Sequence, residues 1–480
     1  MRRACPYLLA SILFLTLSPL SASAETIAGL PLHVEKIAPG AIRLWVGDHI
    51  SSTAPVAIAT KKGLVIIDTT GLLEIDREMR RVIARELGRD DFAILIDTHE
   101  HDDHTGGNGV YDDCTIVGHE LVAAGMARSR EDRQRVIDWY EGRLPEMEQN
   151  IAQLASDAPE LPRLREELIV QRLRLEALQA DRAPVPPTRT FAERMTLDMG
   201  DVTFELYYIG GMHTASDIAV LVPERGLLLT GDTMADVWLT DTPGCLASFA
   251  ARGGIRHDFP LWLENWHLLL DRQDDIRLLL PGHWNGELSY AGAAARVAYI
   301  ETLWNETRQA SDGGRDLQAM LTDFQLAERF PELVDSPGFN ERNNHGTVVE
   351  IWREVTGQQS AARALHALVE QGADDAEIQA VLARRDAGDT DYYFLESEIN
   401  GFGYDFIRRE MPAQAVRLFR INVELYPEAW NVYDSLGEAL LATGERNEAV
   451  AMYEKSVALN PENANGVQAL ERLRAEGVAN

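Results

Sequence analysis

The chain has 480 residues, enough for two or three domains, and 45% of them are hydrophobic, as is ordinary for globular proteins. Its 76 acidic and 45 basic side chains give a formal net charge of −31. This balance argues against nucleic acid and anionic membrane surfaces as partners, because both are bound through Lys and Arg. No apolar run after the first 24 residues approaches membrane-spanning length.

The first 24 residues have the three parts of a secretory signal peptide. Arg2 and Arg3 are positively charged, residues 7–17 are apolar but too short to span a bilayer, and residues 22–24 are a small-residue cleavage site. We therefore expect cleavage before Glu25 and an exported protein, either periplasmic or secreted. Cleavage leaves Cys114 and Cys245. A disulfide between them and two unpaired, buried thiols remain open alternatives, because sequence contains no geometry.

The next 70 residues predict a sheet with a helix packed on it. Residues 42–46 alternate with period two, as in a half-buried strand, and residues 64–68 form a buried apolar run that ends at Asp68. Residues 74–87 have apolar side chains at helical spacing. Residues 92–96 then form a second buried strand.

Three histidines and three acids follow that strand within six residues, in the order His99-Glu100-His101-Asp102-Asp103-His104. A glycine pair comes directly afterwards and ends any regular strand. Neutral imidazoles and carboxylates together suit zinc and similar divalent metals. The alternative is a polar turn with solvated histidines, which a single His would favour and this dense pattern does not.

This motif resembles the metal motif of the metallo-β-lactamase-fold hydrolases, and the match covers about residues 30–310. The resemblance implies an α/β fold, a four-layer αβ/βα sandwich with metals at one edge. It also implies three further ligands at strand ends, and His213, Asp232 and His283 stand after the strand-like runs 202–209, 227–230 and 276–280. Each of the three has a neighbouring glycine within three residues.

The resemblance also implies two divalent metal ions, which we expect to be zinc. His99, His101 and His213 would bind the first. Asp103, His104 and His283 would bind the second, and Asp232 would bridge both. In this family an acid at the position of Asp68 braces the site more often than it binds metal.

Residues 120–185 depart from the compact members of that family. They are rich in Ala, Leu, Glu, Arg and Gln and predict two or three long helices, which the prolines at 184–187 end. The insert separates the first motif from His213 and is therefore expected near the mouth of the site. A lid, a dimerisation arm and a solvated helical decoration all remain open.

The C-terminal part is predicted to be helical. Residues 311–390 form a connector, with a polar turn at 343–346, and residues 391–480 contain a repeat of 34 residues. In that repeat Gly403 matches Gly437 and Phe419 matches Tyr453. The pattern resembles tetratricopeptide repeats, in which a small residue lets two helices approach and an aromatic fills the space between them. Such repeats offer a surface for a homodimer or a protein partner.

The predicted chemistry is hydrolysis of a small molecule by metal-activated water. Two adjacent divalent ions lower the pKa of water and polarise the bond that is cleaved. We assign catalytic roles to Asp232, as the bridge, and to Asp103, as a ligand and proton acceptor. An acid at position 232, where some zinc β-lactamases have cysteine, favours an ester-like substrate: a carboxylic ester, a lactone or a sulfate ester. The alternatives are a β-lactam hydrolase and a non-catalytic scaffold whose repeats bind partners.

Overall fold

The computed structural model describes residues 25–234, 258–284, 288–323, 326–333, 341–386 and 391–478. The described residues fall into two compact units, and the division lies within helix α9 (Tyr290–Asp312), after Val297. The predicted signal peptide and Cys245 lie outside the described residues, so cleavage and cysteine pairing stay predictions. Cys114 is buried.

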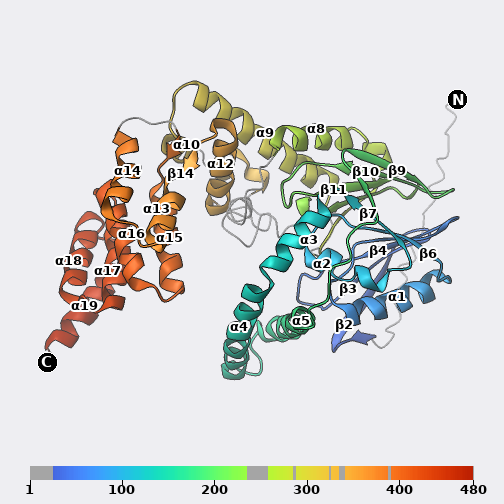
Figure 1. Cartoon of the computed structure of the whole chain (residues 1–480), viewed down its shortest axis with the longest axis horizontal. Helices are drawn as coiled ribbons and strands as arrows, with labels where there is room; N and C mark the ends of the chain where they lie inside the picture. Colours follow the sequence, from blue (N-terminus) through green and yellow to red (C-terminus); the bar gives the residue numbers. More distant parts are fainter. Residues whose placement is uncertain are drawn as a thin grey trace, which may run out of the picture. The chain divides into compact units, whose positions relative to one another are not determined.

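The first unit begins with a sheet of eight strands, which are hydrogen-bonded in sequence order from β1 to β8 (Figure 1). The strands are β1 (Thr26–Ile27), β2 (Leu30–Ala38), β3 (Ala41–Val46), β4 (Val56–Thr60), β5 (Gly63–Ile67), β6 (Phe92–Ile96), β7 (Thr115–His119) and β8 (Arg189–Phe191). Neighbours are antiparallel as far as β5 and parallel from β5 to β8. Ile67 pairs with Ile96, so the ends of β5 and β6 lie side by side.

A second sheet of five strands packs against the first, in the order β13, β12, β11, β10, β9. The strands are β9 (Arg194–Asp198), β10 (Thr203–Tyr208), β11 (Ile218–Val222), β12 (Leu227–Gly231) and β13 (Leu278–Pro281). The β12–β13 pair is parallel and the other pairs are antiparallel. One core joins the two sheets, with side chains such as Ile58, Val65 and Ile96 from the first and Phe204, Val220 and Leu280 from the second.

Helices cover the outer faces of this sandwich. α1 (Leu73–Leu87) buries Ile75, Met79, Val82 and Ile83, whose spacing gives one apolar helix face. These side chains join a core with the outward residues of the first sheet. α8 (Phe259–Leu270) lies over the second sheet (Figure 1) and buries Trp262 and Trp266. The helix–sheet–sheet–helix order confirms the predicted α/β four-layer sandwich.

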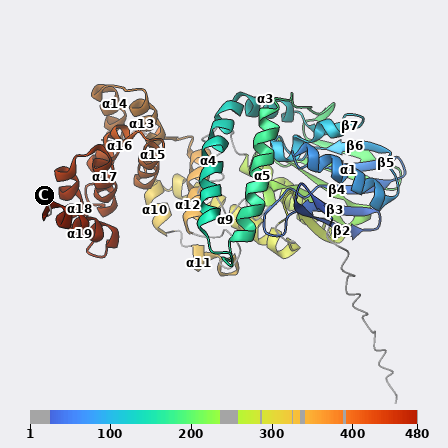
Figure 2. The same ribbon diagram turned by 90° about the horizontal axis from the view of Figure 1, so that it is seen from below.

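Three helices form the predicted insert between β7 and β8: α3 (Val122–Glu131), α4 (Arg133–Gln153) and α5 (Leu161–Gln179). α4 and α5 lie side by side as an antiparallel pair (Figure 2). The 3-10 turns of this unit are η1 (Asn108–Val110), η2 (Pro223–Arg225), η3 (Asp232–Met234) and η4 (Gln273–Asp275), and the short helix α2 (Asp102–Thr105) lies within the His motif.

The second unit is almost entirely helical. Its first part contains α10 (Leu317–Asp323), α11 (Leu326–Arg329), η5 (Pro331–Leu333), α12 (Glu341–Thr356), α13 (Ala361–Glu370) and α14 (Asp375–Asp386), with the strand pair β14 (Gln359–Ser360) and β15 (Tyr392–Tyr393). The predicted polar turn at 343–346 is wrong, because these residues lie inside α12. Asn344 is buried there, and its Oδ1 atom accepts a hydrogen bond of 2.7 Å from the Tyr299 hydroxyl.

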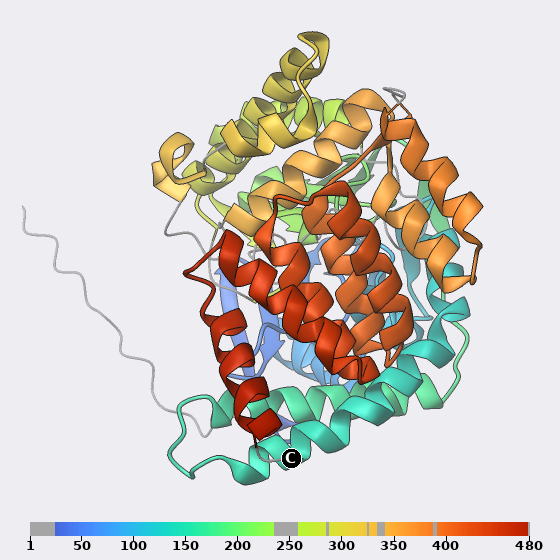
Figure 3. The same ribbon diagram turned by 90° about the vertical axis from the view of Figure 1, so that its left-hand side faces the viewer.

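The last five helices are α15 (Glu396–Arg408), α16 (Pro412–Leu425), α17 (Trp430–Thr443), α18 (Arg446–Leu459) and α19 (Ala464–Val478), drawn in orange to red in Figure 3. Gly403 contacts the Phe419 ring so closely that a Cβ atom would collide with it. A Cβ on Gly437 would lie 3.1 Å from the Tyr453 ring. The predicted small–aromatic packing is therefore present in both repeats. Membership of the tetratricopeptide family and the domain boundaries at 310 and 390 stay predictions.

None of the helices in the described part of the chain is both long and apolar enough to cross a membrane.

Candidate metal centre

Loops at the ends of four strands bring the seven predicted ligands to one edge of the sandwich. His99 and His101 follow β6, and Asp103 and His104 lie in α2. His213 comes from the loop between β10 and β11, Asp232 directly follows β12, and His283 follows β13. The two sheets meet here, since the backbone N–H of Ile218 donates to the Thr98 carbonyl at 2.9 Å.

The first group consists of His99, His101, His213 and Asp232, whose ligand atoms all lie within 4.8 Å of one another. The Nε2 atom of His213 lies 3.0 Å from Nδ1 of His101. Burial, with the nearby charge of His101, lowers the pKa of His213 to about 3. Burial also lowers the pKa of His99 well below its usual value. Both imidazoles are therefore neutral at physiological pH, which is the form that binds metals.

The second group consists of Asp103, His104 and His283. The Nε2 atoms of His104 and His283 lie 3.2 Å apart, and Asp103 Oδ2 lies 3.4 Å from His283 Nε2. Burial opposes charge on both histidines, but the carboxylate of Asp232 outweighs it and raises both pKa values.

Asp232 lies between the two groups. Its Oδ2 atom is 3.2 Å from Nε2 of His283 and 3.4 Å from Nε2 of both His104 and His213, and it is 3.9 Å from Nε2 of His99. Burial raises the pKa of Asp232, but the charges of His283 and His104 outweigh it, so the pKa is well below its usual value. One ionised carboxylate thus contacts imidazoles from both groups.

The donor set fits two divalent cations. The Nε2 atom of His99 and the Oδ1 atom of Asp232 are buried and have no hydrogen-bond partner among the described residues. Such atoms cost free energy unless a ligand satisfies them. In a tetrahedral zinc site with Zn–N distances of about 2.0–2.1 Å, two ligand atoms lie roughly 3.3 Å apart. His213 lies 3.0 and 3.4 Å from His101 and Asp232, and His283 lies 3.2 and 3.4 Å from His104 and Asp103, and these spacings agree with that value. The 3.9 Å between His99 and Asp232 is somewhat longer.

Glycine at position 282 allows the two groups to approach. A Cβ there would lie 2.5 Å from Asp232 Oδ1 and 2.9 Å from His104 Cε1. The segment is fixed on its other side, because the Gly282 carbonyl accepts from Ala54 N–H at 2.8 Å. A side chain at this position would displace Asp232 or His104.

Asp68 is placed as the brace that the family resemblance implied. Its Oδ1 accepts from the backbone N–H of Thr98 at 2.8 Å, and its Oδ2 lies 2.8 Å from Thr98 Oγ1 and 2.9 Å from His104 Nδ1. Its backbone has φ +61°, a left-handed conformation that side-chain-bearing residues seldom adopt. Such strain persists where surrounding contacts hold it, often at functional sites.

Asp217 is a supporting residue that sequence reasoning missed. Its carboxylate accepts hydrogen bonds from the backbone N–H groups of Met212, His213 and Thr214, at 3.1, 2.6 and 2.9 Å. It thereby fixes the loop that presents His213. The spacing of four residues after His213 was a possible signal, since Asp commonly accepts from nearby backbone N–H groups in turns.

The helical insert forms one wall of a cavity beside the second group. The cavity has a volume of about 630 Å³. Asp103, Thr70 and His283 line it from the sandwich. Arg143 and Met147 of α4, and Arg163, Leu164 and Arg174 of α5, line it from the insert. This placement agrees with the expectation that the insert lies near the mouth of the site.

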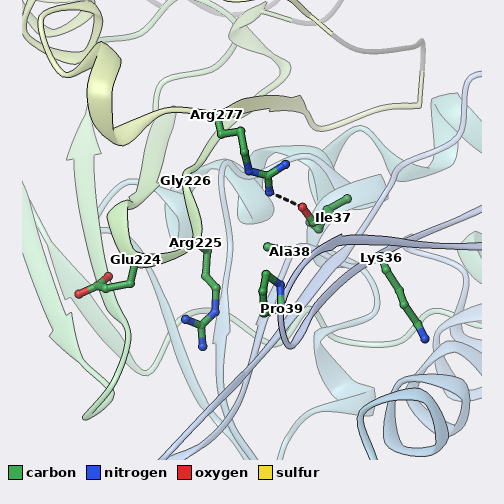
Figure 4. Close-up of a pocket in the computed structure, with 8 residues that line it drawn as sticks. All are labelled: Lys36, Ile37, Ala38, Pro39, Glu224, Arg225, Gly226 and Arg277. Atoms are coloured by element: carbon green, nitrogen blue, oxygen red, sulfur yellow. Dashed lines mark hydrogen bonds between the residues drawn. The ribbon is translucent and has the colours of Figure 1, made fainter. Parts of the chain in front are cut away.

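A second hollow, of about 650 Å³, lies at the opposite ends of β12 and β13 (Figure 4). Arg277 precedes β13 and donates to the Ile37 carbonyl, which joins the two sheets at this edge. None of the seven predicted ligands lines the hollow. The candidate chemistry is therefore confined to the other edge.

A known protein-family model matches part of the chain. Residues 52–283 match the family model of the metallo-beta-lactamase superfamily. The 2,4-dinitroanisole O-demethylase subunit alpha of Nocardioides sp. (strain JS1661) is 24% identical over 246 residues, which are 50% of this chain and 55% of that protein. The chain thus spans about half the length of this curated relative.

Solved structures of low sequence identity also match. A metallo-beta-lactamase from Pontibacter korlensis is 20% identical with a TM-score of 0.36, and the match covers 56% of this chain and 97% of that one. A stereoselective inverting sec-alkylsulfatase from Pseudomonas sp. is 14% identical with a TM-score of 0.49, covering 90% of this chain and 66% of that one.

Proposed function

Because residues 52–283 belong to the metallo-beta-lactamase superfamily, we propose that this protein is a binuclear metal-dependent hydrolase that uses water as its nucleophile. The observation that carries the proposal is the position of Asp232 Oδ2, 3.2–3.4 Å from imidazole nitrogens of both groups. Two bound divalent ions would lower the pKa of a water molecule and polarise the bond to be cleaved.

The proposed roles divide the seven side chains between two ions. His99, His101 and His213 would hold the first, and Asp103, His104 and His283 would hold the second. Asp232 would serve both ions, and its negative charge would offset the repulsion between two dications. Asp103 lies at the cavity wall with an ionised carboxylate, where it can also accept a proton.

We further propose an ester-like substrate, namely a carboxylic ester, a lactone or a sulfate ester. The cavity is of a size for a small molecule, and it is lined by Arg143, Arg163 and Arg174, whose N–H groups suit ester oxygens. The acid at position 232, where some zinc β-lactamases carry cysteine, supports the same choice over a β-lactam.

Metal analysis combined with a substrate screen tests the proposal. Elemental analysis of protein purified with metal supplementation should give close to two divalent ions per chain, which we expect to be zinc. The same sample should hydrolyse a carboxylic ester, lactone or sulfate ester faster than a β-lactam or 2,4-dinitroanisole, the compound in the name of the curated relative. A protein without stoichiometric metal and without activity on any of these would favour the scaffold alternative.

Export also belongs to the proposal. The first 24 residues have the order of charged, apolar and small residues that signal peptidases recognise. N-terminal sequencing of protein from periplasm or culture medium should give Glu25 as the first residue. A cytoplasmic product that keeps Met1 would contradict export.

We also propose that the C-terminal repeats serve in assembly. α15–α18 repeat the same helix packing at an interval of 34 residues, as modules that contact partners do. Light scattering of the full chain distinguishes the two forms of this proposal. A dimer mass supports self-association, and a monomer mass excludes it.

A further inference from the structure

We propose that Arg174, which the helical insert carries, is a positioning residue of the metal centre that holds the Asp103 carboxylate beside His283. Arg174 has this role only if Asp103 binds the second metal, as proposed above. The insert would then be part of the active site rather than a decoration on it.

Three side chains from separate segments make the arrangement. The Nη2 atom of Arg174, on α5, lies 3.2 Å from Asp103 Oδ2, on α2. The same Asp103 oxygen lies 3.4 Å from His283 Nε2, which follows β13. All three residues line the cavity. The guanidinium group of Arg174 therefore contacts the carboxylate of Asp103 from the side of the insert.

A second contact fixes α5 to the sandwich. The Glu166 carboxylate accepts from the backbone N–H groups of Asp48 and His49, at 3.0 and 2.8 Å. Glu166 and Arg174 are eight residues apart, which is about 12 Å along a helix. With two attachment points, α5 presents Arg174 to Asp103 from a defined position.

Charge makes the contact more than incidental packing. A guanidinium group is always charged in proteins. The side chain of Arg174 is 35% exposed and that of Asp103 is 17% exposed, so water screens this ion pair less than a fully exposed one. A carboxylate must be ionised to bind a metal, and a neighbouring guanidinium favours that form.

Groups that hydrogen-bond to a ligand orient it and tune its affinity for metal. Removal of such a group commonly costs about 10–100-fold in metal affinity or activity. A solvent-exposed ion pair of the same geometry contributes little to stability and has no effect on one metal in particular. A loss of metal affinity at the second site alone, on removal of Arg174, would therefore distinguish a positioning role from a simple surface ion pair.

Arg172 supplies a matched control on the same helix. Its Nη2 atom lies 2.7 Å from Oε1 of Glu148 on α4, so it also makes an ion pair between helices. It is two residues from Arg174 and is not among the residues that line the cavity. Arg172→Gln thus removes an equivalent charge and helix–helix contact without touching Asp103.

Chelator competition on the full chain measures the affinity of each metal site. Arg174→Gln should weaken the second metal about 10–100-fold and leave the first unchanged. Arg174→Lys, which keeps the charge and one donor, should recover part of the loss. Arg172→Gln should bind both metals like the wild type. Circular dichroism and thermal unfolding of each variant report whether the insert stays folded.

Two results would overturn the role of Arg174 alone, in a wild-type protein that binds two metals. One is an unchanged second-site affinity in Arg174→Gln. The other is an equal loss at both sites together with reduced helix content, which would make Arg174 a general brace of the insert. A wild-type protein that binds fewer than two metals would instead overturn the proposed function, and the role of Arg174 with it.

Discussion

The Oδ2 atom of Asp68 lies 2.9 Å from the Nδ1 atom of His104, and both side chains are buried. When Nδ1 of His104 donates this hydrogen bond to Asp68, Nε2 is the ring nitrogen that remains for a metal. Nε2 is the atom that faces Asp232 and His283. Asp68 thus selects the tautomer that a ligand at this position needs.

Asp68→Asn should weaken the second metal about 10–100-fold. Asn has almost the same size and tolerates the left-handed backbone, so the fold should persist. Its amide N–H₂, turned toward Nδ1, would favour the other tautomer of His104. Chelator competition measures the loss. Asp76→Asn is a control, since it changes a buried carboxylate that accepts hydrogen bonds from Thr70 rather than from a predicted ligand. If Asp68→Asn binds the second metal as tightly as the wild type does, Asp68 does not select the tautomer of His104.

Asp76 should make stability depend on pH. Burial raises its pKa to about 7 from 3.8, so the folded protein favours the neutral form. The stability from this group is fully present below about pH 4 and is lost as pH rises through about 7. At 1.36 kcal/mol per pKa unit the change is at most about 4 kcal/mol. Thermal unfolding should therefore show a smaller loss from pH 5 to pH 8 in Asp76→Asn than in the wild type. Equal losses would show that Asp76 is not the source.

Gly403→Ala should destabilise the C-terminal helices by about 1–3 kcal/mol, as overpacking does. The added methyl group would collide with the Phe419 ring. Gly401 is two residues earlier on α15 and has no atom within 4 Å of an added Cβ. Gly401→Ala should therefore stabilise the helix slightly, by up to about 1 kcal/mol. Thermal unfolding measures the stability of both variants. An equal change in stability in the two would contradict the close packing of Gly403 against Phe419.

The candidate metal ligands at one edge of the sandwich could be predicted because each lies in a short, local sequence pattern. Each predicted ligand stands just after an apolar strand run, as His99 does after β6 and Asp232 after β12. Parallel pairing then brings the ends of β5 and β6, and of β12 and β13, to the same edge. The family resemblance added which His and Asp residues to combine. The resemblance also implied the sandwich, and the predicted strands and the helical spacing of residues 74–87 agree with it.

The features that were missed depend on contacts distant in sequence. Asn343–Gly346 looked like a turn because Asn and Gly favour turns, but Tyr299 satisfies the buried Asn344 from 45 residues away. Arg174 is one of several arginines in a helical segment, and nothing local distinguishes it from Arg172. Only the docking of α5 brings Arg174, and not Arg172, to Asp103, 71 residues earlier.

Asp232 is proposed to serve two metals at once, and its replacement by Asn tests this role. Asn keeps the size of Asp232 but removes the charge that lies 3.2–3.4 Å from imidazoles of both groups. Asp232→Asn should therefore lower the occupancy of the second metal. It should also reduce kcat more than it raises KM, because transition-state stabilisation is lost while the cavity walls remain.

The measurement is steady-state kinetics and elemental analysis on the same sample of Asp232→Asn, with the wild type measured in parallel. The substrate is a carboxylic ester, lactone or sulfate ester that the wild type hydrolyses. We expect fewer than two metals per chain and a strongly reduced kcat. An Asp232→Asn protein that holds two metals and keeps a near-normal kcat would contradict it.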